Sequence, residues 1–175
     1  MSNTSIRIAL RVIRLCLIFA VVANLRGGED ADVTKGDPGR VVLSGSSAKI
    51  RAERMEFDKP AGAIQGLMRP ADSVEWDFQV DRAGWYQVIV HYALAVDPLK
   101  GVGVWEAQVG DQTRLGPIHA TGAGDRFLPQ VLFDPIDLET GRQQLKLTIR
   151  SGGAGLPEMK IRKVEIVRAR EPGRP

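Results

Sequence analysis

Apolar side chains recur at every second position in the segments between glycines and prolines, and this spacing is typical of strands with one buried face. All 19 glycines and all 10 prolines lie beyond residue 23, and they cut the chain into pieces too short for long helices. We therefore expect seven or eight strands joined by turns. This pattern predicts an all-β fold, an antiparallel β-sandwich or jelly roll, over residues 40–168.

The alternation also predicts which side chains form the interior. The positions expected to face inward are Val74, Trp76, Phe78, Val80, Tyr86, Val88, Val90, Tyr92, Trp105, Ala107, Val109, Leu145, Leu147, Ile149, Met159, Ile161, Val164 and Ile166. Val131 and Phe133 indicate a further strand, and residues 41–43 an early edge strand. In the last strand the phase slips at Arg162 and Lys163, which predicts a β-bulge.

Residues 47–57 fit two patterns. Ala48, Ile50 and Ala52 alternate as in a strand, whereas Ala48, Ala52 and Met55 also follow helical spacing, with Ser47 as a potential helix cap. We favour the strand and keep the helix as the alternative.

The first 23 residues have the order of a secretory signal. Three arginines (Arg7, Arg11 and Arg14) precede an apolar run, and small residues follow where a signal peptidase cleaves. The run of nine apolar residues is well short of the roughly 20 that span a bilayer. We expect residues 1–23 to be a signal peptide and the protein to be secreted or periplasmic, with no membrane attachment after cleavage. An uncleaved anchor is the alternative.

Composition limits the partners and the chemistry. Residues 24–39 carry charge and glycine but few apolar side chains, so we expect a flexible linker there, and a disordered tail over residues 169–175. The net charge of +3 comes from the three early arginines, since the other 21 bases are balanced by 21 acids. We therefore expect no nucleic-acid partner. The only cysteine is Cys16, so no disulfide is expected beyond it.

Few side chains are typical of catalysis. The two histidines, His91 and His119, accompany no G-x-S-x-G motif and no zinc-ligand spacing. Both are expected at the surface. Glu75 and Asp77 share a strand face, where solvated carboxylates are more common than an acid/base pair. We expect no catalytic residue and no metal ligand, and keep a small polysaccharide hydrolase or lyase as the least favoured function.

Four segments carry a family resemblance. VEWDFQVDRAGWYQVIVHYAL (residues 74–94) resembles the centre of a galactose-binding-domain-like β-sandwich. The segments ATGAGDRF (120–127), LETGRQQLKLTI (138–149) and MKIRKVEIV (159–167) resemble a later loop and two later strands of the same fold. The resemblance covers roughly residues 45–168. It implies a carbohydrate-binding-module-like domain of the kind found beside secreted sulfatases and glycosidases.

The chain departs from the sugar-binding members at two places. The tryptophan that usually follows "TG" in the loop is replaced by Asp125, Arg126 and Phe127. The acidic pair that holds calcium in such domains is also missing, because Glu53 would face the last-strand residues Arg162 and Lys163. We therefore expect no calcium and no other cofactor.

The resemblance and the residue chemistry together predict a glycan-binding site. Trp85 is out of phase with Tyr86 and should point outward, where its ring could stack on the apolar face of a sugar. Arg126 could bind a carboxylate or sulfate on an acidic sugar. The candidate ligand-binding residues are Trp85, Asp125, Arg126 and Phe127. The alternative is a cell-surface sandwich without a sugar site that docks an extracellular protein.

Overall fold

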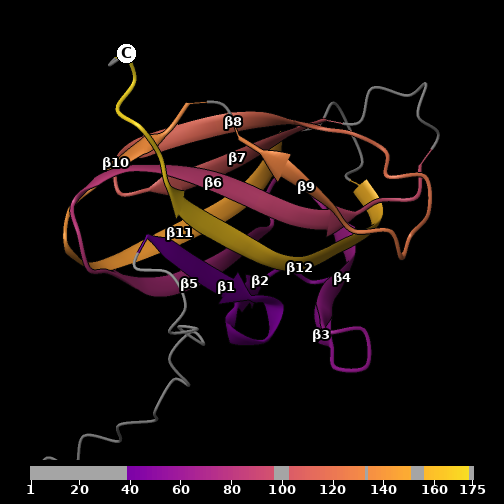
Figure 1. Cartoon of the computed structure of the whole chain (residues 1–175). Helices are drawn as coiled ribbons and strands as arrows, with labels where there is room; N and C mark the ends of the chain where they lie inside the picture. Colours follow the sequence, from indigo (N-terminus) through magenta and orange to yellow (C-terminus); the bar gives the residue numbers. More distant parts are fainter. Residues whose placement is uncertain (1–38, 97–102, 133, 151–155, 174–175) are drawn as a thin grey trace, which may run out of the picture.

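The structure is a computed structural model that describes residues 39–96, 103–132, 134–150 and 156–173 (Figure 1). Within these ranges, twelve strands form two antiparallel sheets packed face to face, so the predicted all-β sandwich is confirmed. The expected number of seven or eight strands was too low, because short strands such as β2 (Lys49–Arg51), β3 (Met55–Asp58) and β10 (Ile136–Leu138) have only three or four residues. No helix in these ranges is long and apolar enough to cross a membrane. The predicted signal peptide and all of the predicted linker except Gly39 lie outside the described residues.

The larger sheet has seven strands, with β6 and β12 side by side at its centre (Figure 1). Its strands are β1 (Arg40–Ser44), β3 (Met55–Asp58), β4 (Ala63–Met68), β6 (Gly84–Ala93), β9 (Leu128–Val131), β10 (Ile136–Leu138) and β12 (Leu156–Arg168). On one side of β12, β4 pairs with its first half and β1 with its second half. On the side of β6 that faces away from β12, β10 pairs with the start of the strand and β9 with its second half.

The smaller sheet has five strands in the order β2-β5-β11-β7-β8. Its strands are β2 (Lys49–Arg51), β5 (Ser73–Val80), β7 (Gly103–Val109), β8 (Gln112–Ile118) and β11 (Gly141–Arg150). Residues 47–57 contain β2 and β3 and no α-helix, so the strand interpretation of this segment is confirmed. A short 3₁₀-helix (Gly45–Ser47) lies just before β2.

The interior is formed by the alternating residues that the sequence indicated. Every side chain predicted above to face inward is buried, apart from the separate Val131–Phe133 segment. Trp76 and Trp105 are fully buried, and Tyr92 meets Trp105 edge-on with ring centres 5.4 Å apart. The indole N–H of Trp76 donates to the Ser44 carbonyl over 2.8 Å, which satisfies its buried polar group.

Two local features refine the predicted strands. The bulge in β12 is confirmed, because its pairing with β6 shifts register between Ile161 and Lys163. The strand predicted around Val131 exists as β9, but Val131 is 48% exposed and its neighbour Leu132 is buried instead. The Leu132 amide donates to the Val88 carbonyl over 3.0 Å, which fixes this inward turn just after β9. Phe133 lies outside the described residues.

Candidate functional site

Trp85 lies on the outer face of the seven-stranded sheet, as its phase predicted. It is half-buried and stands opposite Asp137 of β10 in the register. Its carbonyl accepts a hydrogen bond of 2.8 Å from the Ala169 amide, so the chain just beyond β12 is fastened to this end of β6.

The loop before β9 holds the other three candidate residues. Its base is fixed by the buried Thr121, whose hydroxyl accepts from the Leu94 amide over 2.9 Å. Asp125 and Arg126 are exposed, and the Arg126 amide donates to the Ala123 carbonyl over 3.1 Å. The loop therefore presents both charged side chains to solvent from a fixed base.

Phe127 is half-buried and already has a stacking partner. The guanidinium carbon of Arg162, at the bulge of β12, lies 3.7 Å from the centre of its ring. This is the geometry of a cation–π contact. One face of the ring is therefore covered by a cation, and the aromatic surface left for a ligand is smaller than the sequence indicated.

The structure brings three of the four candidates together and keeps the fourth apart. Asp125, Arg126 and Phe127 are consecutive, and the next residue, Leu128, pairs with Tyr92 near the end of β6. Trp85 lies seven residues earlier in β6, which at about 3.3 Å per residue is about 23 Å away. A single small sugar cannot touch both Trp85 and the loop.

A pocket of about 800 Å³ opens beside this loop. It lies between the β3–β4 hairpin, the start of β12 and the loop residue Gly124. The side chains that line it include Glu53, Glu56, Gln65, Glu158 and Lys160. The volume lies within the range of about 300–1,000 Å³ that is common for small-molecule sites.

Two unusual backbone positions shape the pocket. Gly66 has φ of +132°, and a Cβ atom there would come within 1.9 Å of the Arg54 carbonyl oxygen. Glu158 has φ of 53°, a left-handed conformation that is uncommon for a residue with a side chain. It lies where the pairing of β12 with β4 shifts register, between Leu156 and Met159. Such bulges redirect side chains, and this one lies at the pocket lining.

The acidic residues near the pocket do not form a metal site. Glu53, the position that could match the family's calcium ligand, lies 3.5 Å from a guanidinium nitrogen of Arg69. The two last-strand positions carry cations, with Arg162 on Phe127 and Lys163 on Glu165. In the described part of the chain, no group of three His, Cys, Asp or Glu side chains is arranged to hold a metal ion. Glu53, Arg162 and Lys163 therefore do not fit the calcium site that the resemblance implies.

A cluster of charges lies on the outer face of the seven-stranded sheet. Glu165 is 5% exposed, and its Oε1 atom lies 2.7 Å from Arg40 Nη2 and 2.5 Å from Lys163 Nζ. Burial by itself would raise the pKa of Glu165, but the hydrogen bonds from Lys163 and Arg40 outweigh it and lower this pKa to about 2. The carboxylate therefore stays charged throughout the neutral range.

His91 borders the same cluster. It is half-buried, and its Nε2 atom is buried 3.3 Å from Glu165 Oε1 without an aligned hydrogen bond. Burial lowers the pKa of His91, and Glu165 opposes that shift only in part. Folding therefore favours the neutral form of the imidazole. The side chain faces outward as predicted, while the exposed histidine is His119.

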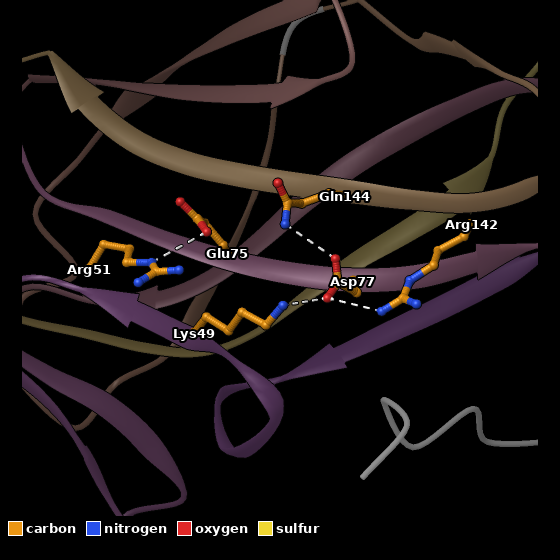
Figure 2. Close-up of polar contacts among 6 residues, drawn as sticks. All are labelled: Lys49, Arg51, Glu75, Asp77, Arg142 and Gln144. Carbon is orange, nitrogen blue, oxygen red and sulfur yellow. Dashed lines mark hydrogen bonds and ion pairs between the residues drawn. The ribbon is translucent and has the colours of Figure 1, made fainter. Parts of the chain in front are cut away.

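The outer face of the five-stranded sheet carries a separate set of ion pairs. Asp77 accepts from Lys49 over 2.6 Å, from Arg142 over 3.4 Å and from Gln144 over 3.2 Å (Figure 2). Glu75 lies 3.7 Å from Arg51 (Figure 2). Each carboxylate is held by its own cations, and the two are not arranged around a shared reaction centre.

The chain shares its fold with solved carbohydrate-binding modules. A family 35 module from Clostridium thermocellum matches with a TM-score of 0.55 and 15% identity, covering 74% of this chain and 98% of the module. A family 35 module from Cellvibrio japonicus matches with a TM-score of 0.53 and 16% identity, covering 73% of this chain and 92% of the module. A family 6 module from Clostridium stercorarium, in complex with cellobiose, matches with a TM-score of 0.55 and 10% identity, covering 73% of this chain and 93% of the module.

No protein-family model matches the chain, and no curated protein matches it either. At these identities the likeness shows the fold. The chain therefore has the β-sandwich fold of these carbohydrate-binding modules, and the resemblance seen in the sequence is confirmed at the level of the fold.

The pocket is the part of the candidate site that the sequence did not predict. Its walls come from the β3–β4 hairpin and the start of β12, which carry no sugar-binding motif. One signal was available: Gly66 interrupts the apolar segment of β4, and a glycine inside a strand often marks a close backbone approach.

Proposed function

We propose that this protein is a secreted, non-catalytic module that binds glycans in the pocket beside the loop at residues 121–127. The observation that carries the proposal is the pocket itself, a hollow of about 800 Å³ with charged and amide side chains at the loop end of the sandwich. The fold adds support, since its structural neighbours include carbohydrate-binding modules.

The lining chemistry suits sugar hydroxyls. The carboxylates of Glu56 and Glu158 accept hydrogen bonds, the amide of Gln65 donates and accepts, and the ammonium of Lys160 donates. A hydroxyl both donates and accepts, so a polyhydroxylated ring can satisfy all of these groups together. Bonds to the charged members are the stronger ones.

The loop residues complete this site at its rim. Gly124 lines the pocket, and Asp125, Arg126 and Phe127 follow directly. In our proposal Arg126 and Asp125 reach over the rim to polar groups of the ligand. Phe127, stacked on Arg162, supplies an apolar edge. Trp85 is too far from the pocket to touch the same sugar ring.

The test is a glycan array with neutral and acidic oligosaccharides, followed by calorimetry on any hit. Gln65→Ala and Lys160→Gln should each weaken binding by roughly three- to tenfold, the worth of one or two hydrogen bonds. Lys146→Gln is the matched control, because Lys146 is an exposed strand lysine on the other sheet. It should leave binding unchanged.

Two results would count against the proposal. Failure to bind any glycan would remove the function and favour the alternative of a module that docks an extracellular protein. Binding that survives both pocket substitutions undiminished would keep the function and reject the pocket.

A further inference from the structure

The outer face of β6 extends the candidate site well beyond the pocket. Trp85, Gln87, Ile89 and His91 alternate with core residues and so share this face. In the register, β12 places Lys163 beside His91 and Glu165 beside Ile89. We call the surface from Lys160 through Arg162 and Lys163 to Trp85 the outer track.

The outer track begins at the pocket. Lys160 lines the pocket and belongs to β12, and the Phe127–Arg162 stack follows two residues further along that strand. Trp85 marks the far end, about 23 Å along β6 from the residue that pairs with Leu128. That length is several times the size of one sugar ring.

The charge along the track is positive. Outside the pocket, whose lining also holds Glu53, Arg54, Glu56 and Glu158, the track has four positive charges from Arg40, Lys160, Arg162 and Lys163 and two negative charges from Glu165 and Asp137. The two carboxylates are not equivalent. The Glu165 side chain is 6% exposed and is covered by its cations, whereas the Arg40 side chain is 44% exposed and the Lys163 side chain 31%. Within this cluster, the cations are therefore the groups that a ligand can contact.

Strongly exposed apolar side chains are few on the outer track. Among the described residues of this face, Val131 is the single large apolar side chain that is strongly exposed. Contiguous apolar patches of several hundred Å² are what mark protein-docking faces. Trp85 is half-buried and lies at one end of this face.

We propose that the outer track binds a linear polysaccharide that carries carboxylate or sulfate groups, with these anionic groups over the track and the hydroxyl groups of one end unit in the pocket. This inference rests on the proposed function and names its ligand class. Arg162 and Lys163 lie opposite the anionic groups, and Trp85 stacks on a ring several units away from the pocket. Affinity therefore increases with chain length until the ligand reaches Trp85.

The experiment compares three polymers by calorimetry: polygalacturonate, dextran sulfate and neutral dextran. The expected result is binding of at least one anionic polymer, weakened as NaCl is raised from 50 to 500 mM, and weak or no binding of dextran. The anionic polymer that binds more tightly shows whether the track prefers carboxylate or sulfate groups. Equal binding of all three polymers without a salt effect overturns the proposal.

Substitutions then separate the track from the pocket. Trp85→Ala should weaken binding of the long anionic chain by roughly three- to tenfold, and Arg162→Gln by roughly three- to fivefold. Arg142→Gln, an exposed arginine on the other sheet, is the control and should have no effect. Circular dichroism and the Tm of each variant confirm that it is folded.

Short oligosaccharides distinguish failure of this inference from failure of the proposed function. If di- and trisaccharides bind and the affinity neither grows with length nor responds to Trp85→Ala, the pocket stands and the track is rejected. If the long anionic chain binds through Trp85 and Arg162 while Gln65→Ala has no effect, the track stands and the pocket is rejected. Capture of a protein partner through Trp85, with no polysaccharide bound, overturns the inference.

Discussion

Arg162 lies with its guanidinium carbon 3.7 Å above the centre of the Phe127 ring, and this contact ties the loop before β9 to the bulge of β12. A cation–π pair at an exposed site contributes about 0.5–1 kcal/mol. We expect a double-mutant cycle with Phe127→Leu and Arg162→Gln to give a coupling free energy of that size in urea unfolding. Strictly additive effects of the two substitutions would show that the stack contributes nothing to stability.

Gly66 is the position where substitution should be most harmful. Gly66→Ala places Cβ 1.9 Å from the Arg54 carbonyl oxygen, at a φ of +132° that side chains rarely adopt. We expect a loss of about 3 kcal/mol or more in the free energy of unfolding. Gly62→Ala is the matched control, since Gly62 also has positive φ but open space around it. It should cost only about 1 kcal/mol. Equal losses would mean that β3 and β4 separate easily at the pocket wall.

The core was predictable from the sequence because the buried positions of a strand are apolar at every second residue. Trp76, Tyr86 and Trp105 each fall in the phase of their strand, and all three are buried. The bulge in β12 was predictable for the same reason, since an extra residue shifts the phase at Arg162 and Lys163. These signals are local, so no knowledge of strand pairing is needed to read them.

The candidate site was less predictable because it depends on strand pairing. The distance between Trp85 and Phe127 follows from the register of β9 on β6, which the sequence alone does not reveal. The left-handed backbone of Glu158 is also invisible in the sequence, since glutamate rarely adopts it. Arg162 over Phe127 joins residues 35 positions apart.

The ion pairs around Asp77 should contribute little to stability. Its hydrogen bond from Lys49 is the main cause that lowers the pKa of Asp77, but the side chain is 25% exposed and solvent screens the charges. We expect Asp77→Asn to cost less than about 1 kcal/mol at pH 7 in low salt, with most of the effect lost in 0.5 M NaCl. Glu75→Gln removes a single, longer pair at 3.7 Å and should cost less still. A loss from Asp77→Asn that salt leaves unchanged would contradict this account.

Glu165 should give the protein a distinct sensitivity to acid. Its pKa is lowered from 4.5 to about 2, so its contribution to stability is complete above about pH 4.5 and is lost as the pH falls toward 2. A shift of this size corresponds to at most about 3 kcal/mol. Glu165→Gln should therefore destabilise the protein at pH 7, and the difference from the wild type should shrink as urea unfolding is repeated toward pH 2.

His91 should cause a second loss of stability in acid, at a higher pH than the loss caused by Glu165. Burial lowers the pKa of His91 below its usual 6.5, so folding favours the neutral ring, and stability is lost as the pH falls below about 6.5. His91→Gln should remove the part of the pH dependence that begins there and leave the part below pH 4.5, which comes from Glu165 with a smaller share from Asp77. The unfolding free energy of both variants between pH 7 and pH 2 tests the assignment. If His91→Gln removed the loss below pH 4.5 as well, the two groups would titrate as one unit, and the charge of Glu165 would depend on the imidazole more than on Arg40 and Lys163.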